Sequence, residues 1–118
     1  MNKEDLTARD FAGHILQAAD RILGYTRGMT REEFFADTLK QDAVIRNIEI
    51  IGEATNNLLE AAPGIADKYP FIPFYEMYGM RNRVAHGYFS VSLPMIWDSV
   101  EVDVPELRRR IAKVLEEL

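Results

Sequence analysis

The chain has 118 residues, of which 47% are hydrophobic, and its 14 basic and 19 acidic residues leave a net charge of −5. Residues 1–118 are therefore expected to form a single globular domain, and the acidic balance argues against a protein that coats nucleic acid through bulk charge. The absence of cysteine excludes disulfides and thiolate metal sites and suits a reducing cytoplasm. We expect no signal peptide and no membrane span, because no apolar run reaches ~20 residues.

Capping patterns predict where the first helices begin. Thr7 followed by Asp10 resembles a capping box, and apolar residues then recur at helical spacing. The run 30–33, Thr-Arg-Glu-Glu, is a second capping box that starts a new helix. Asp37 and Thr38 form a local cap that turns the chain in a new direction.

The third predicted helix, from about residue 39 to residue 59, carries two stripes. The apolar stripe, which we expect to be buried, consists of Leu39, Val44, Ile45, Ile48, Ile51, Thr55, Leu58 and Leu59. The polar stripe contains Arg46, Glu49 and Glu53, which are spaced for ion pairs along the helix. A solvated, salt-bridged face is the plain interpretation. Gly52 weakens it, because a glycine inside a helix costs about 1 kcal/mol relative to alanine and often permits close approach of a backbone or ligand.

Prolines divide the second half of the chain. Residues 65–69 form one short turn at most, and Pro73 begins a helix that should end at about His86. A heptad seam follows, in which steps of four and three connect Leu93, Trp97, Val100, Val104, Leu107, Ile111, Val114 and Leu118. Pro105 lies inside the seam and predicts a kink. No stretch has a strand pattern, so we expect an all-α antiparallel bundle of four to five helices.

The densest chemistry lies just before this seam. Five polar side chains fall within eight residues: Arg81, Asn82, Arg83, His86 and Tyr88. An arginine presents a planar fork suited to phosphate, and a histidine changes charge near neutral pH. On a straight helix Arg81 and His86 point ~140° apart, because each residue turns the helix by ~100°. The two side chains would converge only at the end of the helix, or across a two-fold axis with a second chain.

A guanidinium and an imidazole are enough for RNA cleavage without a metal. The 2′-OH of RNA is an internal nucleophile, His86 could accept or donate its proton, and Arg81 could stabilise the charge on phosphorus. Asn82 could orient either group, and Arg83 could either position a neighbouring phosphate or be a surface residue. By spacing alone a structural interpretation is favoured, because Arg and His commonly complement the C-terminal end of a helix. With two histidines, one of them (His14) expected at the surface of the first helix, no metal or cofactor site is predicted.

The motif Arg81-Asn82-x-x-x-His86-x-Tyr88, together with residues 46–54 (RNIEIIGEA) and 97–107, resembles the HEPN superfamily. Within it the chain is most similar to HepT toxins, which are encoded beside a minimal nucleotidyltransferase antitoxin, MntA, in type VII-like systems. The resemblance implies a HEPN-like helical bundle and a homodimer whose motifs face one another in a shared cleft. It also implies a metal-independent endoribonuclease that acts on RNA.

The resemblance assigns roles to individual residues. It implies that Arg81, His86 and Asn82 are catalytic and that Tyr88 is the position to which the MntA-like partner attaches AMP. The added bulk and negative charge would block RNA. Arg83 and the stripe residues Arg46, Glu49 and Glu53 would support the cleft. A non-catalytic HEPN module that pairs with a nucleotidyltransferase is the alternative function, and a purely structural helical dimer is a third.

Overall fold

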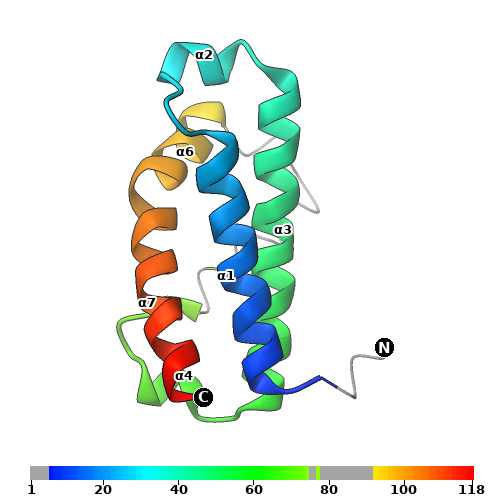
Figure 1. Ribbon diagram of the computed structural model, residues 1–118, viewed down its shortest axis with the longest axis vertical. Helices are drawn as coiled ribbons and strands as arrows, with labels where there is room; N and C mark the ends of the chain where they lie inside the picture. The colour runs from blue at the N-terminus through cyan, green and yellow to red at the C-terminus, as the bar shows by residue number, and fades with distance from the viewer. Residues whose placement is uncertain (1–5, 75–76, 78–91) are drawn as a thin grey trace.

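The computed structural model describes residues 6–74, 77 and 92–118, and these residues form helices and turns without a strand. The predicted all-α class is confirmed. The elements, in chain order, are α1 (Ala8–Tyr25), α2 (Arg31–Phe35), α3 (Thr38–Ala61), α4 (Ile65–Lys68), α6 (Leu93–Asp98), the π-helix η3 (Ser99–Asp103) and α7 (Val104–Glu117). Figure 1 shows α1, α3 and α7 along the length of the molecule, with α2 and α6 at one end and α4 at the other.

The predicted capping boxes are both present. The backbone N–H of Thr7 donates to the Asp10 carboxylate at 2.9 Å, and the N–H of Asp10 donates to the Thr7 hydroxyl at 3.2 Å. Thr30 and Glu33 exchange the same two hydrogen bonds at 2.9 and 3.1 Å. Asp37 accepts from the N–H of Lys40 at 3.0 Å and so begins α3. Each cap satisfies backbone donors that the first turn of a helix leaves free, which explains why local sequence was sufficient here.

Helix α1 packs against both α3 and α7, and its apolar stripe forms the centre of the core. The buried residues of α1 are Phe11, Ala12, Ile15, Ala18, Ala19 and Ile22. Five of the eight α3 residues expected in the core are buried, namely Val44, Ile48, Ile51, Thr55 and Leu58, and Ile45 and Leu59 are partly buried. The prediction was wrong for Leu39, which is 75% exposed. Leu39 lies in the first turn of α3, directly after the five-residue α2, and is not among the described residues that form the core or pack against it.

The C-terminal seam keeps its phase through an irregular helix. Trp97, Val100, Val104, Ile111 and Val114 are buried, as the heptad pattern predicted. The structure places the irregularity just before the proline rather than at it, because residues 99–103 form a π-helix in which the N–H of Val104 donates to the carbonyl of Ser99. Pro105 has no N–H to donate, and the wider turn before it shifts the hydrogen-bond pattern without moving the seam out of the core.

Long-range polar contacts tie α7 to α1 and to the segment after α4. Arg9 donates to the carbonyl of Leu115 at 3.0 Å, and Arg108 pairs with Asp20 at 2.8 Å, so α1 and α7 are tied at two levels. The Tyr69 hydroxyl donates to the Glu117 carboxylate, which ties the segment after α4 to the end of α7. This hydrogen bond is the main reason why the pKa of Tyr69 is raised above its ordinary value of 10.0. Within the described ranges, no helix is long and apolar enough to cross a membrane.

Candidate functional site

The predicted motif residues Arg81, Asn82, Arg83, His86 and Tyr88 lie outside the described residues. Of the helix predicted from residue 73 to residue 86, the structure describes Phe74, which is buried, and Met77, which is half-buried. The other predicted histidine, His14, is exposed on α1 and contacts the edge of the Phe11 ring, as the surface interpretation required.

The supporting residues on α3 are only partly brought together. Arg46 pairs with Glu49 at 3.4 Å, and their side chains are 67% and 32% exposed. Glu53 follows Glu49 by one helical turn, is exposed, and pairs with no basic residue in the part of the chain that the structure describes. An ion pair with this exposure contributes little to stability, so the polar stripe is free to serve another purpose.

Asn47, between Arg46 and Ile48, is a polar residue that the sequence did not single out. Only 4% of it is exposed, and its side-chain amide donates to the Ala43 carbonyl at 2.8 Å. Its Oδ1 atom accepts no hydrogen bond from any described residue. The other buried polar side chains among the described residues, Thr26 and Thr55, each donate to the carbonyl four residues earlier. An asparagine that leaves its acceptor unused in the core is unfavourable, which is why such residues are uncommon there.

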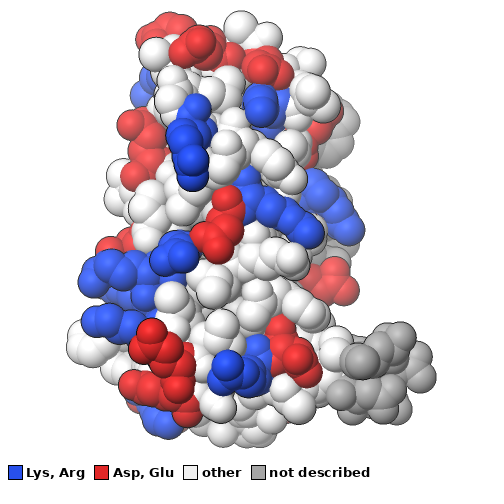
Figure 2. All heavy atoms as spheres, viewed as in Figure 1, with Lys and Arg blue, Asp and Glu red and all other residues white. Residues whose placement is uncertain are grey.

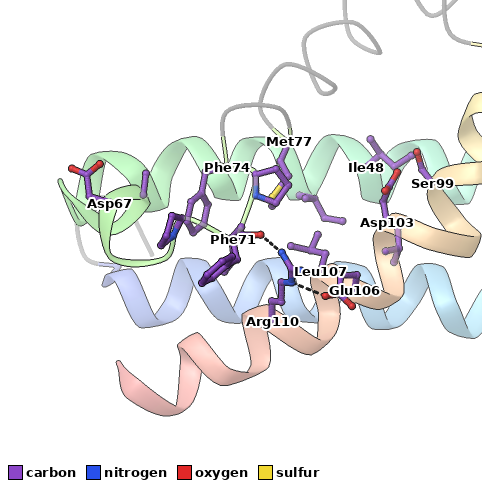
Figure 3. Close-up of a pocket in the computed structure, with 16 residues that line it drawn as sticks. Ile48, Asp67, Phe71, Phe74, Met77, Ser99, Asp103, Glu106, Leu107 and Arg110 are labelled. Atoms are coloured by element: carbon purple, nitrogen blue, oxygen red, sulfur yellow. Dashed lines mark hydrogen bonds and ion pairs between the residues drawn. The ribbon is translucent and has the colours of Figure 1, made fainter.

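A cavity of about 710 Å³ opens between α3, the segment after α4, η3 and α7. Figure 3 shows its side chains converging from these elements. The apolar part of the lining includes Ile48, Ile51, Phe74, Val104 and Leu107. No local sequence pattern could have indicated this cavity, because its walls come from segments up to about 60 residues apart in the sequence. Only tertiary packing brings these segments together. We call it the α3–α7 groove.

Charged and polar side chains lie around the α3–α7 groove. The Arg110 guanidinium donates to Glu106 at 2.7 Å and to the carbonyl of Phe71, and Figure 3 draws both contacts. Hydrogen bonds from Arg109, and then from Arg110, hold the pKa of Glu106 below its ordinary value of 4.5. Ser99 and Asp103, both on the π-helix η3, also line the groove, and their side chains form no hydrogen bond with another described residue. π-Helical turns are frequent at functional sites.

The charges that line the groove are unbalanced. Asp67, Asp103 and Glu106 supply three carboxylates, and Arg110 supplies the one guanidinium among the described lining residues. No group of three or more acidic or histidine side chains within the described ranges is arranged to hold a metal ion. The groove therefore presents acceptors to a ligand that carries donors, rather than a coordination sphere.

The surface around α1 and α7 has no broad patch of one charge. Figure 2 shows basic and acidic side chains interspersed on this face, with acidic side chains gathered near α2. The α2 helix contributes Glu32 and Glu33, and the pair of Arg108 with Asp20 is an example of the mixing. A mixed surface of this kind gives little long-range attraction for a polyanion, so a nucleic-acid site here would have to be local.

Residues 15–114 match the sequence model of the family described as ribonuclease HepT-like. This chain belongs to the HepT-like family. The match runs from the middle of α1 through most of α7 and includes the segment that contains the Arg81-to-Tyr88 motif. The resemblance based on residues 46–54, 81–88 and 97–107 is thereby confirmed at the level of the family, and the roles of individual residues remain predictions.

Several curated proteins are similar over most of this chain. It is 36% identical over its whole length to "Putative RNase MJ0125" of Methanocaldococcus jannaschii, of which it covers 97%. It is 36% identical over 90% of its length to "Probable ribonuclease HepT" of Thermococcus cleftensis, of which it covers 94%. The M. jannaschii protein "Gamma-glutamylcyclotransferase and putative RNase MJ0434" is 42% identical over 92% of this chain, which spans only 47% of that protein. No solved structure matches the chain significantly.

Proposed function

We propose that this HepT-like protein is a metal-independent endoribonuclease and the toxin of a type VII-like HepT/MntA toxin–antitoxin system. The observation that carries the proposal is the combination of the family match with the motif Arg81-x4-His86-x-Tyr88. The relatives named as ribonucleases support the same activity. The two functional groups of the motif have the chemistry that RNA cleavage requires.

The cleavage step uses the RNA itself as nucleophile. The 2′-oxygen attacks the adjacent phosphorus and the bond from phosphorus to the 5′-oxygen breaks, which leaves a 2′,3′-cyclic phosphate and a 5′-hydroxyl. His86 accepts the 2′-OH proton or donates a proton to the departing 5′-oxygen. Arg81 stabilises the negative charge on the phosphate oxygens, and Asn82 orients one of these groups. Arg83, Arg46, Glu49 and Glu53 support the site.

The ~140° between Arg81 and His86 on a straight helix favours a site shared by two chains. A homodimer would bring the arginine of one chain to the histidine of its partner. It would also double the number of local basic groups that face the RNA, which matters in a protein of net charge −5. RNA binding in the cytoplasm would then depend on this cleft and less on the mixed outer surface.

Tyr88 provides the means of inhibition. A nucleotidyltransferase partner would transfer AMP from ATP, so that a bond forms between the phenolic oxygen and the α-phosphorus, the tyrosine proton is lost and pyrophosphate leaves. The product adds a negative charge and a nucleotide two residues from His86, which would exclude RNA by bulk and by charge repulsion. Intact-mass measurement after co-expression should show AMP-sized increments that vanish in Tyr88→Phe.

The proposal is tested by cleavage of RNA in the presence of a metal chelator. We expect His86→Ala and Arg81→Ala to lower the rate by about 100-fold or more, which is the usual contribution of a general acid–base group or a charge-stabilising donor. His14→Ala is the matched control, because this exposed histidine on α1 should leave the rate unchanged. Equal cleavage by all three variants would mean that the motif is not catalytic.

The alternative function is a non-catalytic module that pairs with a minimal nucleotidyltransferase. The acidic net charge and the mixed surface are the observations that favour it. Intact RNA after long incubation with wild-type protein, together with a stable complex with the nucleotidyltransferase encoded beside it, would support this alternative and overturn the nuclease proposal.

A further inference from the structure

Phe71 is a large aromatic side chain that the fold presents to solvent. It is 77% exposed, and it follows Pro70 in a segment whose backbone Pro73 also restricts. Ile72, the next residue, is only 6% exposed and anchors the segment in the core. The Arg110 guanidinium donates to the carbonyl of Phe71. The ring is therefore held at the surface by a backbone that its neighbours fix in place.

Two arginines of α7 converge next to this segment. Arg109 and Arg110 both donate to Oε1 of Glu106, at 2.5 and 2.7 Å. Their side chains are 62% and 37% exposed, so each guanidinium can be reached from solvent. A guanidinium has five N–H donors, and one shared carboxylate cannot engage all the donors of two such groups. The pair therefore has donors available for a ligand beside the exposed ring of Phe71.

Lys113 extends this cationic group by one helical turn. It lies four residues after Arg109 and three after Arg110, and these spacings place side chains on one face of a helix. Lys113 is exposed and forms no ion pair with another described residue. Figure 2 shows basic side chains gathered over the middle of α7. We call the surface formed by Phe71 and these three cations the Phe71 face.

The carboxylates around the Phe71 face leave it with positive charge to spare. Within the described ranges its three cations have a single carboxylate bonded to them, that of Glu106. Glu117 accepts the hydrogen bond of the Tyr69 hydroxyl instead. Glu116, one turn beyond Lys113, is exposed and would oppose an anionic ligand. The face is thus a local cationic site on an otherwise mixed surface.

The Phe71 face is separate from the acidic lining of the α3–α7 groove. Neither Arg109 nor Lys113 lines that groove. Figure 3 shows Asp67 and Asp103 toward opposite ends of the groove, with Phe71 between them. A ligand can therefore contact the ring and the outer cations without approaching these carboxylates.

We propose that the Phe71 face binds single-stranded RNA, with one base stacked on the Phe71 ring and the adjacent phosphate bonded to Arg109 and Lys113. Every base has a flat face that stacks on an aromatic ring, and neighbouring cations hold the backbone, so such sites bind single strands without reading sequence. A protein partner with an apolar pocket would fit the ring but not the cations around it. The face uses no residue of the motif, and the choice of RNA as its ligand rests on the proposed ribonuclease function.

The first test measures the affinity for a fluorescein-labelled single-stranded RNA by anisotropy. The 2′-oxygens of the RNA are methylated, so that no internal nucleophile remains and the strand stays intact. We expect Phe71→Ala to weaken binding by about 10-fold, the usual effect of removing one stacking platform. Phe71→Leu, which is apolar but not aromatic, should lose as much, and Phe71→Trp should bind at least as tightly as wild type.

The matched control for the ring is Tyr25→Ala. Tyr25 is an exposed aromatic residue at the end of α1, and the Lys40 ammonium lies 5.8 Å from its ring centre. This variant should bind RNA as wild type does. An equal loss in Tyr25→Ala and Phe71→Ala, wild-type affinity in Phe71→Leu, or no binding by wild type would each overturn the proposal.

The second test concerns the cations. Lys113→Gln should weaken binding and lower the slope of log affinity against log salt by about 0.7, the value for one phosphate contact with a single strand. Lys40→Gln should leave the slope unchanged. Glu116→Gln should instead tighten binding, because it removes a negative charge one turn from Lys113. If Lys113→Gln kept the wild-type slope, or Glu116→Gln bound more weakly, RNA would not contact this face.

The third test asks whether a second copy of the chain covers the ring. Sedimentation of wild type and Phe71→Ala without RNA should give the same mass at every protein concentration. A lower mass for Phe71→Ala would assign the ring to an interface between two copies, and the proposal would fail.

Cleavage of unmodified RNA separates this inference from the proposed function. We expect Phe71→Ala to raise KM by about 10-fold and to leave kcat unchanged, because the ring binds the substrate without touching the reacting atoms. If wild type binds RNA through Phe71 but does not cleave it, the nuclease proposal fails and the RNA contact stands. If wild type cleaves RNA and Phe71→Ala has the same KM, the nuclease proposal stands and the RNA contact is wrong.

Discussion

The two long sides of helix α3 differ in what they face. On the side against α1, Val44, Thr55 and Leu58 have no exposed surface, and the one hydroxyl among them donates to the Ile51 carbonyl at 2.6 Å. On the side toward α7, Ile48 and Ile51 are also buried, at 7% and 5% exposed, but they line a cavity with charged side chains at its rim. Both sides are apolar in sequence, so hydrophobic pattern alone does not distinguish a closed core from an open groove. The closed side provides stability, and the open side has room for function.

The largest expected effect is a difference in the free energy of unfolding between a substitution in the closed core and one at the groove rim. Phe34 is fully buried and its ring lies 5.1 Å from that of Trp97, whereas Phe71 at the rim is 77% exposed. We expect Phe34→Ala to lower the free energy of unfolding by about 3–5 kcal/mol, because it leaves a cavity in a packed core. Phe71→Ala should change it by less than about 0.5 kcal/mol, as surface substitutions do.

Chemical denaturation of the two phenylalanine variants measures this difference directly. If Phe71→Ala proved as costly as Phe34→Ala, the rim of the groove would be buried in the native protein, and the contrast between the two sides of α3 would disappear.

A smaller effect concerns the charged rim and depends on pH. Hydrogen bonds from Arg109 and then Arg110 depress the pKa of Glu106, so its carboxylate is more stable in the folded chain than in the unfolded one. The stability that this provides is fully present above the ordinary pKa of 4.5 and is lost as the pH falls through the lower, folded value. Glu106→Gln should therefore unfold more easily than wild type at neutral pH, and the difference should narrow in acid.

The control for this prediction is Glu116→Gln, at an exposed position on the same helix. This variant should unfold much like wild type at neutral pH, because surface substitutions change the free energy of unfolding by less than about 0.5 kcal/mol. A gap between wild type and Glu106→Gln that stayed constant with pH would show that the two arginines do not stabilise the ionised form.

The smallest expected effect tests whether the polar stripe of α3 belongs to the site. Its ion pair, Arg46 with Glu49, is largely exposed. Arg46→Gln should change the free energy of unfolding by at most about 0.5 kcal/mol. If the stripe supports the cleft, RNA cleavage by this variant should fall several-fold despite its unchanged stability. Unchanged cleavage would mean that the polar stripe is only a solvated, salt-bridged face of α3 and does not support the cleft.

Local sequence determined where the helices begin and which faces they bury. The caps at Thr7, Thr30 and Asp37 were predictable because a cap satisfies backbone groups within three residues of itself. The heptad seam was predictable because burial on one side of a helix imposes its period on the sequence. The motif from Arg81 to Tyr88 and the family followed from residue types at fixed spacing.

Tertiary structure decided what no local rule contains. The exposure of Leu39, the burial of Asn47 and the walls of the α3–α7 groove each depend on which helix lies opposite, and the sequence specifies that only through the sum of many weak contacts. The π-helix before Pro105 is similar, because a proline predicts a disturbance but not its form, and here residues 99–103 form a π-helix while Trp97 and Ile111 on either side of it stay buried. The sequence alone thus indicated the proposed catalytic motif and the family, whereas the α3–α7 groove exists only because of how the helices pack.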